Sequence, residues 1–154
     1  MTIFIRKIMV GCFCINFIIL MYLLFLSSYR QSVYGTLAYN VIPFKSISDY
    51  IMHFNGFGWR LLTDNFFGNI FAFVPFGFFI AYFIEKQFLK VVGLSFFFSF
   101  AIEVTQVLIR AGAFDVDDIV LNTTGGVIGF LIFSSISRLL TDWKVKHEYR
   151  RKTY

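Results

Sequence analysis

Charged residues are scarce in this sequence. They make up 15% of its 154 residues, whereas 58% are hydrophobic and 21% aromatic, and the mean hydropathy is +0.72. About a quarter of the residues of a soluble domain are charged, so the composition excludes a soluble globular protein. Apolar segments of roughly 20 residues recur, each long enough to cross a hydrocarbon core of ~30 Å. The sequence therefore predicts a protein that crosses the lipid bilayer more than once.

Cysteine is also rare. The two cysteines, Cys12 and Cys14, both lie in the first apolar segment. Residues two apart on a helix point about 200° away from each other, which argues against a mutual disulfide or a shared metal ion. The stretch between Lys7 and Cys12 is too short for the apolar core of a signal peptide, so we expect this segment to remain as an uncleaved span.

Strict alternation of apolar and polar residues, which a membrane β-barrel needs, is missing too. Runs such as residues 94–100 are apolar on all sides, and helices satisfy their own backbone hydrogen bonds in lipid. We expect an all-α, multi-pass helical bundle in a single membrane domain, residues 1–154, ending in a basic cytoplasmic tail, 140–154. The predicted transmembrane helices cover residues 8–26, 66–84, 88–109 and 119–139.

The first loop between spans has a pattern of its own. Residues 40–44 are expected to be extended, since Pro43 biases the preceding residue away from helix. Ser46 or Ser48 is then expected to cap a short helix. That helix would lie in the membrane interface, because its apolar residues recur at helical spacing: Ile47, Tyr50, Ile51 and Phe54. Further on, Gly125 and Gly129 predict close packing between helices.

The net charge of +5 is explained by orientation rather than by binding to nucleic acid. Basic residues favour the cytoplasmic side of a membrane. This rule predicts that both termini are cytoplasmic. One side would carry Arg6, Lys7, Lys86, Lys90, Arg138, Lys144, Lys146, Arg150, Arg151 and Lys152, and the other Arg30, Lys45, Arg60 and Arg110.

Polar residues gather between the third and fourth spans, in residues 103–122. Ionisable groups inside a bilayer are costly and usually mark function. The spacing of Glu103, Gln106 and Arg110 predicts that they share one helical face. Topology places further polar groups at a similar depth on the same side. The predicted binding residues are Asn40, Arg60, Asn69, Glu103, Gln106, Arg110, Asp115, Asp118 and Asn122.

Purely structural roles remain as alternatives for some of these residues. Asp117 or Asp118 would also suit the N-terminal dipole of the fourth helix as a cap. Asn69 would also serve as an interhelical hydrogen bond, and Arg110 would also mark the membrane interface. Glu103 is the strongest candidate for a functional role, because a buried acid is expensive.

A set of residues within 35–135 carries a resemblance to a known family: 40–44, Asn69, Ile70, Phe71, Pro75, Gly77, Glu103, Gln106, Arg110, Asp115, Asp118, Asn122, Gly125, Gly126 and Gly129. On these residues the chain resembles the VanZ-like family, which is named after an accessory protein of glycopeptide-resistance clusters associated with teicoplanin resistance. The resemblance covers residues 35–135. It implies a small helical membrane domain of the bacterial envelope, located in the plasma membrane.

Three hypotheses for the polar site follow. In the first, it binds or shields a lipid-linked or cell-wall component, with arginine taking phosphate or carboxylate. In the second, the protein is an intramembrane enzyme with Glu103 as general acid or base and the aspartates as a weak Mg²⁺ or Ca²⁺ site, Asp115, Asp117 and Asp118. In the third, the protein is a structural or chaperone subunit. No Ser-His-Asp or HExxH pattern is present, and we expect no cofactor.

Overall fold

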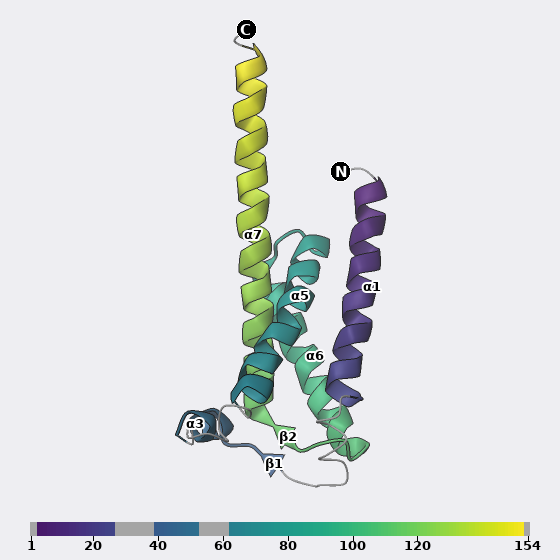
Figure 1. Cartoon of the computed structure of the whole chain (residues 1–154), viewed down its shortest axis with the longest axis vertical. Helices are drawn as coiled ribbons and strands as arrows, with labels where there is room; N and C mark the ends of the chain where they lie inside the picture. Colours follow the sequence, from purple (N-terminus) through teal and green to yellow (C-terminus); the bar gives the residue numbers. More distant parts are fainter. Residues whose placement is uncertain (1–2, 27–38, 53–61, 153–154) are drawn as a thin grey trace.

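The computed structural model describes residues 3–26, 39–52 and 62–152. Most of this part of the chain is helical (Figure 1). The elements in chain order are α1 (Ile3–Phe25), β1 (Tyr39–Asn40), α3 (Lys45–Met52), the π-helical η1 (Leu62–Phe67), α5 (Gly68–Phe83), α6 (Phe88–Leu108), β2 (Phe114–Asp115) and α7 (Val116–Lys152).

Among the described residues, four helices are long and apolar enough to cross a membrane: Ile3–Phe25, Asn65–Phe83, Phe88–Leu108 and Val116–Lys144. The predicted all-α, multi-pass architecture is therefore confirmed. The first helix begins earlier than expected and takes in Arg6 and Lys7, whose long side chains can reach the interface from a helix end. The last helix continues to Lys152, so residues 140–152 extend the fourth helix.

The helices lie side by side, with both termini at one end of the bundle (Figure 1). α3 and the two short strands lie at the other end. α7 reaches well beyond the turn that joins α5 to α6, so its final turns project away from the bundle (Figure 1). The bundle therefore has one end that carries the two chain termini and one end that is covered by α3 and the two short strands.

The contact between α5 and α7 is the most extensive in the bundle, and glycines make it close. A Cβ atom at Gly77 would overlap the carbonyl oxygen of Gly126, and one at Gly129 would overlap that of Val74. Gly125 meets the backbone of Ile70 in the same way. The predicted close packing through Gly125 and Gly129 is therefore confirmed, and the two backbones are in direct contact.

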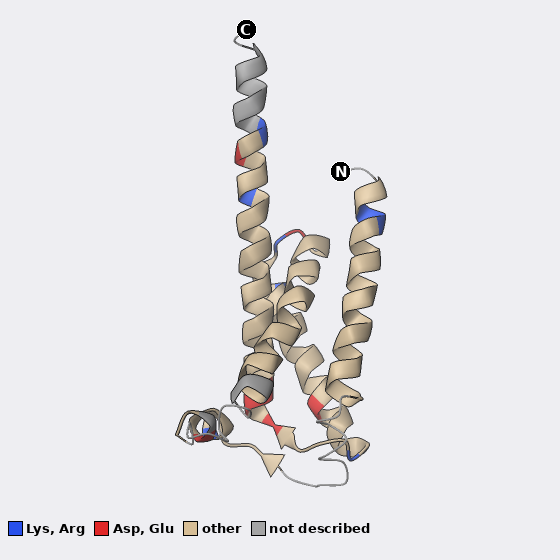
Figure 2. Cartoon of the chain, in the orientation of Figure 1, with Lys and Arg blue, Asp and Glu red and all other residues tan. Residues whose placement is uncertain are grey.

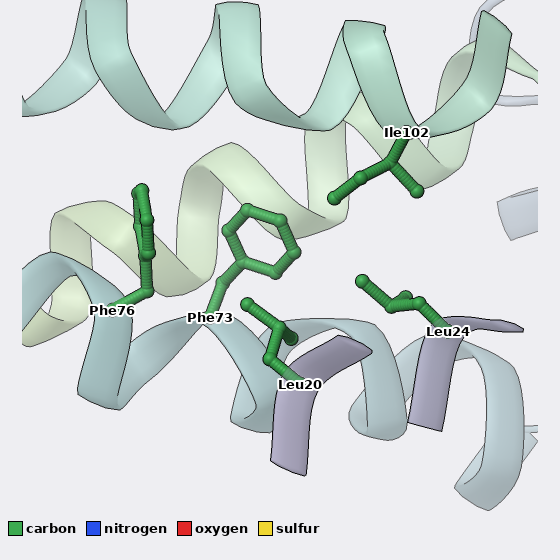
Figure 3. Close-up of a cluster of buried hydrophobic side chains, with 5 residues drawn as sticks. All are labelled: Leu20, Leu24, Phe73, Phe76 and Ile102. Carbon is green, nitrogen blue, oxygen red and sulfur yellow. The ribbon is translucent and has the colours of Figure 1, made fainter. Parts of the chain in front are cut away.

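Aromatic and aliphatic side chains join α1 to the α5–α6 pair. Figure 3 shows the buried cluster at this junction: Leu20, Leu24, Phe73, Phe76 and Ile102. The ring of Phe98 stacks on that of Phe76, with centroids 4.8 Å apart. This apolar cluster lies beside the polar residues of α6, so it helps to fix their position.

Candidate functional site

The strands β1 and β2 bring the first loop to the start of α7. They pair in parallel, with Tyr39 opposite Phe114 and Asn40 opposite Asp115. The paired residues are 75 positions apart in the chain. This pairing places the polar groups of the first loop beside the aspartates, as the sequence predicted for Asn40.

Asn40 organises the loop through its side-chain amide. Its Nδ2 donates to Oδ1 of Asp115 and to Oγ of Ser46, both at 2.9 Å. The Ser46 hydroxyl in turn donates to Oδ2 of Asp115 at 2.6 Å, while the backbone N–H of Ile42 donates to Oδ1 of Asn40 at 3.3 Å. Both carboxylate oxygens of Asp115 are thereby engaged by the first loop.

The expectation of an extended segment over residues 40–44 holds only at its start. The strand ends at Asn40, and the chain then turns, with Phe44 at a φ of 66°. The hydrogen bond from Ile42 to the Asn40 side chain explains the change, since an Asx turn redirects the backbone within two residues. Pro43 is compatible with this turn as well as with extended chain.

Asp115 caps α7. The backbone N–H of Asp117, at the second helical position, donates to Oδ1 of Asp115 at 2.9 Å, which is the bond an N-cap residue makes. The cap predicted at Asp117 or Asp118 is therefore wrong by two or three residues. Asp117 and Asp118 do lie in the first turn of α7, where their negative charge suits the helix dipole.

Asp117 instead caps α3 from across the fold. Its carboxylate accepts hydrogen bonds from the backbone N–H of Phe44 at 2.6 Å and from that of Ile47 at 3.2 Å. The cap predicted at Ser46 or Ser48 is wrong. Ser46 faces Asp115, and the Ser48 hydroxyl donates to the carbonyl of Lys45. A fully buried carboxylate on α7 thus fixes the predicted interfacial helix, whose existence over Lys45–Met52 is confirmed.

Asn69 and Asp118 connect α5 to α7. The Asn69 Nδ2 donates to Oδ1 of Asp118 at 2.6 Å, and both side chains are buried. The interhelical hydrogen bond considered for Asn69 is therefore present. Two residues predicted for the site are therefore in contact.

Glu103 connects α6 to β2. Its side chain is 1% exposed, and Oε2 accepts a hydrogen bond of 2.9 Å from the backbone N–H of Asp115. Three residues on, the buried Gln106 donates through Nε2 to the carbonyl of Leu24, in the last turn of α1, at 2.9 Å. The shared face predicted for Glu103 and Gln106 therefore holds α6 against two other parts of the chain.

Arg110 does not share this face. α6 ends at Leu108, and Arg110 follows with a φ of 55° and an exposed side chain. The N–H of Arg110 donates to the carbonyl of Val107 and that of Ala111 to the carbonyl of Gln106, which is the Schellman ending of a helix. The predicted i, i+7 alignment with Glu103 fails because the helix stops first. Arg60, also predicted for the site, lies outside the described residues, as does Phe54 of the predicted interfacial helix.

A polar seam is formed by Ser95, Ser99, Glu103 and Gln106 on one face of α6 together with Asn122 of α7. Each of its members is at most 1% exposed. Asn122 donates to Oγ of Ser99 at 2.8 Å, while Oδ1 of Asn122, Oε1 of Gln106 and Oγ of Ser95 have no hydrogen-bond partner among the described residues. The two serines were not predicted. Their spacing of four and eight residues before Glu103 places them on its helical face, and that signal was available in the sequence.

Most acidic residues of the described chain lie at this end of the bundle, and most basic ones at the end that carries the termini (Figure 2). Within the described residues, no group of three or more His, Cys, Asp or Glu side chains is arranged to hold a metal ion. Asp115, Asp117 and Asp118, the weak metal candidates, each face a different partner. Their geometry is that of a hydrogen-bonded clamp between the loop and three helices.

Comparison with known families gives a match over residues 13–139, which include every described residue of this clamp and of the polar seam. The chain belongs to the VanZ/LLP1 family. The match spans the resemblance predicted over residues 35–135 and extends beyond it at both ends. Comparison with curated proteins and with solved structures gives no match. Family membership and the four membrane-spanning helices together establish a VanZ-like membrane protein.

Proposed function

We propose that this protein binds the polar head group of a lipid-linked component of the bacterial envelope, and that the site is the acidic end of the bundle. Binding would take place at the outer face of the plasma membrane, with both termini in the cytoplasm. The excess of basic residues at the terminal end supports this orientation. Masking or altering such a component would reduce the access of a glycopeptide such as teicoplanin.

The observation that carries the proposal is the buried polar seam beside the clamp. Polar side chains within a membrane are rare unless they serve a function, and two amide oxygens here, on Gln106 and Asn122, lack a partner in the part of the chain that the structure describes. Such acceptors suit the hydroxyl and amide donors of a sugar or peptide head group. Arg110 lies exposed nearby at the end of α6, where a guanidinium group suits phosphate or carboxylate.

Glu103→Gln is the variant that tests this function. The amide retains an acceptor oxygen for the N–H of Asp115, so the fold is expected to survive while the charge is lost. Membrane abundance and teicoplanin susceptibility are measured together, beside Asp118→Asn and the exposed control Ser48→Ala. Normal abundance with increased susceptibility for Glu103→Gln supports the proposal. Normal abundance with unchanged susceptibility contradicts it.

The structural hypothesis is the second candidate, and a specific observation favours it. The carboxylates of Asp115, Asp117 and Asp118 all accept hydrogen bonds from within the protein. If Glu103→Gln and Asp118→Asn are both absent from the membrane, this hypothesis replaces the binding proposal. Mass spectrometry of the lipid that co-purifies then separates binding from catalysis, since an enzyme with Glu103 as acid or base converts its lipid to a new species.

A further inference from the structure

A groove lies at the other end of the bundle, away from the acidic clamp. It is about 720 Å³ in volume and is formed by the beginning of α1, the end of α5 and the middle of α7. Sites for small organic ligands have volumes of roughly 300–1,000 Å³. The apolar part of its lining consists of Ile5, Met9, Phe78, Phe133, Ile136 and Leu140.

The mouth of this groove is charged. Glu85 and Lys86 line it from the turn after α5, and Lys144 lines it from α7; all three side chains are exposed. The turn is held by a hydrogen bond from the N–H of Lys86 to the carbonyl of Ala81, which fixes the position of the Lys86 backbone at the groove. Two ammonium groups and one carboxylate therefore surround the entrance to an apolar cleft.

The depth of the groove matches one leaflet of a bilayer. Phe133 lies eleven residues before Lys144 on the same helix, which corresponds to ~16 Å at 1.5 Å per residue. One leaflet contributes roughly half of a ~30 Å hydrocarbon core. With Lys144 at the level of the head groups, Phe133 lies near the middle of the membrane, so the apolar lining follows the course of an acyl chain.

The surrounding charge favours an anionic occupant. Four further basic residues are exposed: Arg6 and Lys7 in the first turns of α1, Lys90 in the first turn of α6 and Arg138 in the later half of α7. Basic residues near a membrane surface attract anionic lipids. Glu85 is the acidic member of the groove lining. One carboxylate and two lysines in the same lining suit a head group that carries both a phosphate and a hydroxyl.

We propose that this groove binds one anionic glycerophospholipid from the leaflet on the side of the termini. The phosphate lies between Lys86 and Lys144, a head-group hydroxyl donates to Glu85, and an acyl chain packs against Phe78 and Phe133. This site is independent of the function proposed for the acidic end, because the two lie at opposite ends of the bundle. Loss of one is expected to leave the other intact.

Native mass spectrometry of the purified full-length protein tests this proposal. The protein is stripped of lipid in detergent and titrated with dioleoylphosphatidylglycerol or dioleoylphosphatidylcholine. We expect the wild type to bind one molecule of the anionic lipid with a preference on the order of 10-fold, and the double variant Lys86→Gln with Lys144→Gln to lose that preference. Equal binding of the two lipids by the wild type overturns the proposal.

A matched control separates the site from the general charge of this end. Lys90→Gln with Arg138→Gln removes the same charge from exposed positions that do not line the groove, and we expect the preference to persist. If this control variant loses the preference for the anionic lipid to the same extent as the groove variant, the groove is not a specific site.

A second variant tests the apolar part of the groove. Ser137→Phe fills the cleft. It is expected to weaken the binding of both lipids and to leave the unfolding midpoint of the protein unchanged. A wild-type dimer that carries no lipid would assign the groove to a second copy of the chain and overturn the proposal.

Discussion

The side-chain amide of Asn69 donates a 2.6 Å hydrogen bond to the carboxylate of Asp118, across the contact between α5 and α7. Both side chains are buried, at 7% and 8% exposure. Glycines hold the same two helices in backbone contact a few turns further along. The helix pair is therefore fixed by one polar contact near the membrane surface and by close packing deeper inside.

Asn69→Ala is expected to destabilise the protein, because it removes the donor from a buried carboxylate. Hydrogen bonds to charged groups contribute about 1.5–3 kcal/mol, whereas polar contacts in membranes average ~0.6 kcal/mol, so we expect a loss of about 1–2 kcal/mol. Unfolding in detergent measures the change. In a double-mutant cycle with Asp118→Asn, additive effects would show that the pair is not coupled.

Gly129→Ala is expected to separate α5 from α7, because its Cβ would overlap the carbonyl oxygen of Val74, and backbone atoms cannot move aside. Overpacking of this kind costs typically ~1–3 kcal/mol. Gly93→Ala on α6 is the matched control, since a Cβ there meets nothing within 4 Å. It is expected to be neutral or to stabilise by up to about 1 kcal/mol through helix propensity. Similar thermal midpoints for the two variants would contradict the packing argument.

Asp117→Ala is expected to release α3 from the bundle while the spans stay folded. It removes the acceptor for the N–H groups of Phe44 and Ile47, and loss of a helix cap costs about 0.5–2 kcal/mol. Hydrogen exchange at these two amides should accelerate. Ser48→Ala removes an exposed hydroxyl bonded only within α3 and should leave their exchange unchanged, so equal acceleration in both variants would speak against Asp117 as the cap.

Arg110→Gly is expected to preserve or raise stability. Arg110 has a φ of 55° at the end of α6, a conformation that costs an L-residue roughly 1–2 kcal/mol and that glycine adopts freely. Arg110→Val is expected to lower the unfolding midpoint at the same position. If Arg110→Gly keeps its abundance in the membrane and yet increases teicoplanin susceptibility, the guanidinium group has a role in binding rather than in folding.

Cysteine labelling tests the proposed orientation. In a background with Cys12→Ala and Cys14→Ala, we expect a membrane-impermeant reagent to label Ser48→Cys in intact cells. Lys90→Cys, exposed at the opposite end, should react only after permeabilisation. The reverse pattern would place the acidic end in the cytoplasm and remove the basis for binding an outer-face component.

The positions of the spans were largely predictable, because the length of an apolar run sets the length of a membrane helix. The third helix was predicted over 88–109 and is observed over Phe88–Leu108. The end of this helix determines the position of Arg110, since the Schellman turn leaves that residue outside the helix. Element boundaries depend on a few local hydrogen bonds, and spacing rules such as i, i+7 hold only as far as the helix continues.

The amino-acid sequence by itself determined a helical membrane bundle with a polar end, because apolar length and the position of charges follow directly from residue order. It also determined that glycines would bring two helices together. Only the tertiary structure decided which partner each aspartate has. Asp115 lies at the N-cap of α7, and Asp117 and Asp118 lie in its first turn, where successive side chains point about 100° apart. Their partners come from β1, α3 and α5, which only the folded chain brings within reach.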